Sequence, residues 1–180
     1  MLHFTWAALN RNPRLNHTVI SKCQSYRYTL WREINGGSGD NLLFICLNPS
    51  VADATMDDPT VRRCMSYAAS WGFSGMFMCN LFAYRATNPE NMKKQSDPIG
   101  PDNNKWIKET ARKCQKIVLA WGNHGGHIDR NTRVAELLST ETLWCFGMTK
   151  SGQPKHPLYL KKTAPLVPFD KANNATVPNL

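Results

Sequence analysis

The chain has 180 residues and a formal net charge of +9, from 22 lysines and arginines against 13 aspartates and glutamates. This length suits one domain with a sizeable core; we take 1–180 as a single domain, with a core at 26–160 and an extended tail at 161–180. The charge favours an acidic partner, nucleic acid first and a nucleotide second. No window holds the roughly 18 apolar residues of a membrane span, so no membrane partner is expected.

Six cysteines are spread along the chain without a CxxC pair. Most of them lie in apolar runs, where a free thiol packs as a small hydrophobic group. We therefore expect a cytoplasmic protein without disulfides and without a structural zinc or iron–sulfur site.

Strand-like apolar runs alternate with segments of helical spacing. The first strand alternates and is rich in aromatic residues, and the later ones are nearly all apolar, as in strands buried on both faces. Strands are predicted at 26–34, 41–48, 75–84, 116–122 and 141–149. Helices are predicted at 58–72, 105–115 and 131–139, with a polar loop at 88–104.

This alternation predicts an α/β fold, a three-layer α/β/α sandwich with a mostly parallel central sheet. Right-handed crossovers would place the ends of the four buried strands, and the loops after them, along one edge. Ligands of open α/β sheets bind at that edge.

Three polar residues at these strand ends are candidates for a site, and each has an ordinary alternative. Asn48 could orient a water or read an amide edge, or it could simply form an Asn-Pro-Ser turn. Asn80 interrupts an apolar strand, where it either bonds the local backbone or presents a donor and an acceptor to a nucleobase. His156, between two prolines, could donate to a developing oxyanion or be an ordinary surface histidine.

Basic residues also follow the strand ends. Arg85, Lys150 and Lys155 could place positive charge along a phosphate chain, or they could be solvated side chains. His124 and His127 form an HxxH pair in a glycine-rich loop, but no third ligand accompanies them, so no metal site is expected.

Four blocks in this order resemble the domain-of-unknown-function family numbered 1643 (DUF1643), which occurs in bacteria and phages. The blocks are 44–94, then DPIGPDNN, AWGNHG and GQPKHPLYL. The resemblance spans 26–160 and implies no activity by itself.

The same blocks more weakly resemble the uracil-DNA glycosylase superfamily. CLNPS is similar to its first motif, CNLFAYRATNP to its second, IVLAWG to its third strand and KHPLY to its His-Pro-Ser motif. Leu158 stands where that motif has serine.

This second resemblance implies a uracil-DNA glycosylase-like fold and a DNA glycosylase that needs no cofactor. Asn48 and His156 would be catalytic, orienting a water and stabilising an oxyanion. Asn80, Pro49 and Ser50 would hold a pyrimidine, possibly a modified one, that is flipped out of the DNA stack.

Two other functions remain open. One is a non-catalytic nucleotide or nucleic-acid binder of phage or host defence that retains the pocket. The other is an N-glycosidase of free nucleosides or nucleotides, which would show little salt dependence.

Overall fold

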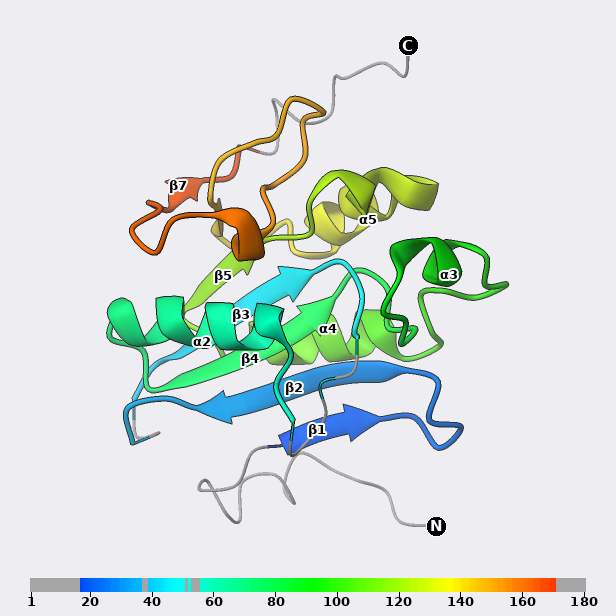
Figure 1. Ribbon diagram of the computed structural model, residues 1–180, viewed down its shortest axis with the longest axis horizontal. Helices are drawn as coiled ribbons and strands as arrows, with labels where there is room; N and C mark the ends of the chain where they lie inside the picture. The colour runs from blue at the N-terminus through cyan, green and yellow to red at the C-terminus, as the bar shows by residue number, and fades with distance from the viewer. Residues whose placement is uncertain (1–16, 37–38, 51, 53–55, 171–180) are drawn as a thin grey trace.

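Seven strands form one mixed sheet in the computed structural model, which describes residues 17–36, 39–50, 52 and 56–170 (Figure 1). The strand order across the sheet is β1-β2-β4-β3-β5-β6-β7. The strands are β1 (His17–Ile20), β2 (Arg27–Glu33), β3 (Asn41–Cys46), β4 (Gly75–Asn80), β5 (Lys116–Leu119), β6 (Leu143–Cys145) and β7 (Val167–Pro168).

The four buried strands β3, β4, β5 and β6 run parallel to one another. The expectation of a mostly parallel sheet is nevertheless wrong, because β1 with β2, β2 with β4, and β6 with β7 pair antiparallel. These antiparallel strands lie on either side of the parallel core. Short connections and tail segments can add such strands, since antiparallel pairing needs no helical crossover.

One face of the sheet is covered by α2 (Pro59–Ser70) (Figure 1). The carboxylate of Asp58 accepts from the amide of Val61 over 2.8 Å and caps the first turn, and Pro59 fits the first helical position. The buried side chains of α2 pack with Phe44 and Met76 of the sheet. The predicted helix at 58–72 is confirmed.

The opposite face of the sheet is covered by α4 (Asn103–Ala111) and α5 (Arg130–Leu137). The structure also holds a short helix, α3 (Pro89–Lys93), where the sequence predicted only a polar loop. The Asn88 side chain caps it by accepting from the Glu90 amide over 2.9 Å. Five residues are too few to produce a helical apolar pattern, which is why this helix was missed.

The carboxyl ends of the parallel strands lie along one edge of the sheet, as expected for right-handed crossovers. Two 3₁₀ segments, η1 (Asn123–Asp129) and η2 (Pro157–Tyr159), occur in the chain that follows β5 and β6. All six cysteines are free thiols. Across the described ranges, no helix has the length and apolarity needed to cross a membrane.

Candidate functional site

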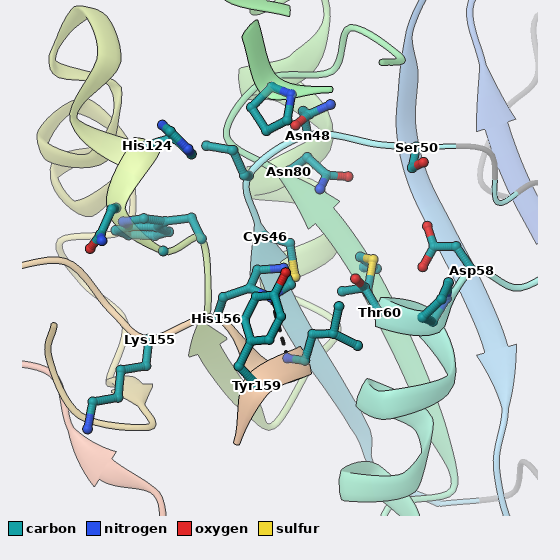
Figure 2. A pocket seen from close by; sticks show the side chains of 18 of the residues that line it. Cys46, Asn48, Ser50, Asp58, Thr60, Asn80, His124, Lys155, His156 and Tyr159 are labelled. Carbon is teal, nitrogen blue, oxygen red and sulfur yellow. Dashed lines mark hydrogen bonds between the residues drawn. The ribbon is translucent and has the colours of Figure 1, made fainter. Parts of the chain in front are cut away.

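A cavity of about 590 Å³ opens at this edge, on the face that α2 covers (Figure 2). It is lined by the ends of β3 and β4, by the start of α2 and by the chain that follows β5 and β6. Its lining includes Arg27, Cys46, Asn48, Ser50, Asp58, Thr60, Asn80, Trp121, Gly122, His124, Thr149, Lys155, His156, Leu158 and Tyr159. Asn48, Asn80 and His156 therefore line one space, although they are distant in the sequence.

Asn48 joins two loops at the top of the cavity. Its Nδ2 donates to the carbonyl oxygen of Ala86 over 2.6 Å and to that of Pro49 over 3.1 Å. Pro49 is buried and outside the lining, and its carbonyl also accepts from the Ala86 amide over 2.8 Å. Ser50 lies on the cavity wall. Asn48 therefore holds the backbone of the turn through its Nδ2. Its Oδ1 is the side-chain atom that remains for a ligand or a water.

Asn80, at the end of β4, is 1% exposed. Its Oδ1 accepts from Nη2 of Arg27 over 3.2 Å, whereas its Nδ2 is buried without a hydrogen-bond partner among the described residues. Its backbone carbonyl accepts from Nδ2 of Asn103 over 3.0 Å. Since a guanidinium can only donate, the amide must turn its oxygen to Arg27.

Arg27 is a site residue that the sequence analysis missed. Its Nη1 donates to the carbonyl of Ala52 over 2.9 Å, and its Nη2 lies 3.7 Å from Sδ of Met78. Burial lowers its pKa to about 10, with the Asp58 carboxylate acting in the opposite direction. The guanidinium is therefore still charged at neutral pH, and none of the described carboxylates forms an ion pair with it.

A β-bulge explains why Arg27 was missed. Val19 pairs with Thr29 and Ile20 with Arg27, so Tyr28 has no partner on β1. Strict alternation from Leu30, which packs on the α2 face, would place Arg27 on the other face. The extra residue reverses that alternation, and a bulge leaves no clear signal in one sequence.

His156 enters the cavity just before η2. Its Nδ1 accepts from the Leu158 amide over 3.4 Å, so the neutral ring carries its proton on Nε2. Burial lowers the pKa of His156, and the nearby Asp58 carboxylate opposes this shift. The ring is therefore neutral at pH 7 and can donate from Nε2.

Two further residues complete the walls. Asp58 places a carboxylate beside the cavity while one of its oxygens caps α2. Tyr159 is 86% exposed at the mouth, with its ring centroid 6.0 Å from that of His156. Figure 2 shows both residues around the same space as Asn80.

The three predicted phosphate-binding residues lie in different places. Lys155 lines the cavity, but Figure 2 shows its ammonium pointing away from Asn80 and His156. Arg85 lies in an adjoining depression that shares Ser50 with the cavity, and its Nη1 donates to the carbonyl of Gln24 over 3.2 Å. Lys150 is exposed and outside the lining.

Three other basic residues line a single depression, unlike the three that were predicted. Arg62, Arg63 and Lys162 line a depression that shares Pro59 and Leu158 with the cavity. Sequence reasoning did not single them out, because they come from a helix and a tail rather than from strand-end loops.

The HxxH pair is divided between two environments. His124 lines the cavity wall, whereas the ring of His127 packs against Phe82, with centroids 5.6 Å apart. Within the described part of the chain, no group of three His, Cys, Asp or Glu side chains could hold a metal ion.

The family described as "Protein of unknown function (DUF1643)" matches residues 27–158. No curated protein and no solved structure matches the chain, so the resemblance to uracil-DNA glycosylases stays a prediction. Because the family match covers most of the chain, this protein belongs to the DUF1643 family.

Proposed function

We propose that this protein is an N-glycosidase of nucleic acid, which holds a pyrimidine base in the cavity and hydrolyses its bond to the sugar. One observation carries the proposal: Asn48, Asn80 and His156 line the same cavity at the carboxyl edge of the sheet. Helices on both faces of the sheet support a uracil-DNA glycosylase-like fold, and the six free thiols suit a reducing cytoplasm.

The chemistry needs few groups. The bond between C1′ of the sugar and the base nitrogen breaks, the electron pair goes to the base, and an oxocarbenium-like sugar forms. The Nε2 proton of a neutral His156 can stabilise the negative charge on a carbonyl oxygen of the base. A water then bonds to C1′ and loses its proton.

Asn48 and Asp58 can bind that water and take its proton. Asn48 has an amide oxygen that can accept from it, and Asp58 offers a carboxylate oxygen that can take its proton. Both lie on walls of the same cavity (Figure 2).

A polymeric substrate is favoured over a free nucleotide by what surrounds the cavity mouth. Arg62, Arg63 and Lys162 form a basic depression next to it, which suits phosphates beyond the one nearest the base. The exposed ring of Tyr159 can stack on an unpaired base. DNA is our choice, with the target base flipped into the cavity.

The proposal is tested with oligonucleotides that each carry one modified pyrimidine, single-stranded and in duplex. Incubation is followed by alkaline cleavage at abasic sites. The wild-type protein should cleave the strand at one class of base. His156→Ala should slow cleavage by about 10²–10³-fold but keep binding, whereas His17→Ala, on β1 against Trp31, should behave as wild type. Binding without cleavage of any oligonucleotide would show a non-catalytic binder instead.

A further inference from the structure

Two buried donors in the cavity lack partners among the described residues. They are Nε of Arg27 and Nδ2 of Asn80, and the two side chains are hydrogen-bonded to each other through Nη2 and Oδ1. A buried donor without a partner costs free energy, and a charged one costs more. A ligand that brings acceptor atoms to this place would remove that cost.

Two other buried arginines show that Arg27 is unusual. Arg32, on the same strand, pairs with the Asp57 carboxylate over 2.7 Å. Arg130 donates from Nε to the Leu81 carbonyl and from Nη2 to Oδ1 of Asn104. Neither of these arginines lines the cavity. Of the three, only Arg27 combines a buried charge with a place on the wall of the cavity.

The charged residues of the lining leave Arg27 as the cation next to Asn80. Among the residues that line the cavity, Lys155 and Arg27 are the lysine and the arginine, and Asp58 is the one residue with a carboxylate. The Lys155 ammonium points away (Figure 2), so Arg27, which is hydrogen-bonded to Asn80, is the buried cation of the lining.

We propose that Arg27 and Asn80 together form a subsite that receives a base through adjacent acceptor atoms, and that Arg27 stabilises the negative charge on the departing base. This inference rests on the proposed function and deepens it. When the glycosidic bond breaks, the base keeps the electron pair, and the charge spreads over its ring nitrogen and carbonyl oxygens. Those atoms are acceptors that match the two donors.

The same geometry sets specificity. Arg27 holds Oδ1 of Asn80, so the free group of the amide is a donor. A carbonyl oxygen of a base can accept from it, but an amino group would bring a donor against a donor. Bases with carbonyl groups on the inward edge should therefore be preferred over bases with an amino group there.

The experiment measures binding of free bases, so it does not depend on turnover. Isothermal titration at one fixed pH compares 5-nitrouracil, chosen because it is an anion at that pH, with uracil, which is neutral. The wild-type protein should bind the anion about ten- to a hundredfold more tightly, the range expected for hydrogen bonds to a charged group. Arg27→Met should remove that preference.

A second variant excludes simple misfolding. Asn80→Asp keeps the shape and places a carboxylate 3.2 Å from Nη2 of Arg27, so it should neutralise the subsite and raise the melting temperature while it abolishes the preference. Arg130→Met removes a buried arginine outside the cavity and should keep the preference.

Three results would overturn the inference. Equal affinity of the wild-type protein for both bases would contradict it and leave the proposed function standing, as would an anion preference that persists in Arg27→Met. Failure of the wild-type protein to bind either base would overturn the inference and the proposed function together.

Discussion

The side-chain amide of Asn80 is held in one orientation because Nη2 of Arg27 donates to its Oδ1 over 3.2 Å. This orientation matters for a ligand, because the amide nitrogen is then a buried donor that has no partner within the described ranges. A strand residue distant in sequence thus decides whether the cavity presents a donor or an acceptor. Asn80 alone, as read from the sequence, would have offered both.

His156 gives the first prediction. His156→Ala should lower kcat by about 10²–10³, the usual effect of removing one oxyanion donor, with little change in substrate affinity. Burial lowers the pKa of His156 below that of an ordinary histidine, so the neutral ring should persist to a lower pH. Activity should therefore fall on the acidic side at a lower pH than an ordinary histidine would give, as His156 is protonated, which also breaks its bond from the Leu158 amide.

The titration of His156 can be followed directly by NMR of its ring protons. The pKa of His156 is lower in the folded state than in the unfolded state. Its contribution to stability is therefore fully present above the unfolded pKa, and it is lost as the pH falls from the unfolded pKa through the folded pKa. A midpoint at or above that of an ordinary histidine would contradict this account.

The loop after β5 gives a second prediction, with a matched control. A Cβ on Gly125 would overlap the indole of Trp121, which lines the cavity. Gly125→Ala should therefore cost about 1–3 kcal/mol in unfolding free energy, as overpacking does, and should weaken ligand binding. In Gly126→Ala the nearest atom is 3.7 Å from the new Cβ, so chemical denaturation should show no loss. Equal effects of the two changes would contradict the packing described.

The basic depression gives a third prediction. Lys162→Ala should weaken binding to oligonucleotides about equally across sequences and flatten the slope of log affinity against log salt by roughly one unit. Lys108→Ala, on α4 across the sheet, should leave the slope unchanged. If both variants behave alike in titrations at several salt concentrations, Arg62, Arg63 and Lys162 do not form the phosphate path.

The ion pair between Arg32 and Asp57 gives a fourth prediction. Nε of Arg32 lies 2.7 Å from Oδ1 of Asp57, with side-chain exposures of 1% and 25%. Asp57→Asn removes the Asp57 charge from beside a buried guanidinium, and the partial exposure of Asp57 reduces the effect below that of a fully buried pair, so a loss of about 1–3 kcal/mol is expected. Glu90→Gln removes the exposed pair with Lys93 and should leave the denaturation midpoint unchanged. A loss in Glu90→Gln that matched the loss in Asp57→Asn would contradict this ranking.

The parallel core was predictable from the sequence, because β3, β4, β5 and β6 are apolar runs separated by helix-length segments. The antiparallel strands were not, since neither the sheet position of β2 nor the existence of the short strands β1 and β7 leaves a periodic signal. The pairing of β2 with β4 skips β3 in the chain, and only long-range packing decides that.

The site was predictable to the extent that strand ends locate it. Asn48, Asn80 and His156 were found by their place after buried strands, and they line one cavity. Arg27 could not be found, because the bulge at Tyr28 changes the face on which it lies. Side-chain direction was also beyond the sequence: Lys155 follows a strand end as expected, yet its ammonium points away from the cavity.

The central claim is tested most directly by chromatographic measurement of free base released from the oligonucleotide panel and from the corresponding nucleosides and nucleotides. We expect one class of pyrimidine to be released from the oligonucleotides, in amounts equal to the abasic sites formed, and to be lost in His156→Ala. Release from none of these substrates, or release that is unchanged in His156→Ala, would contradict the proposed function.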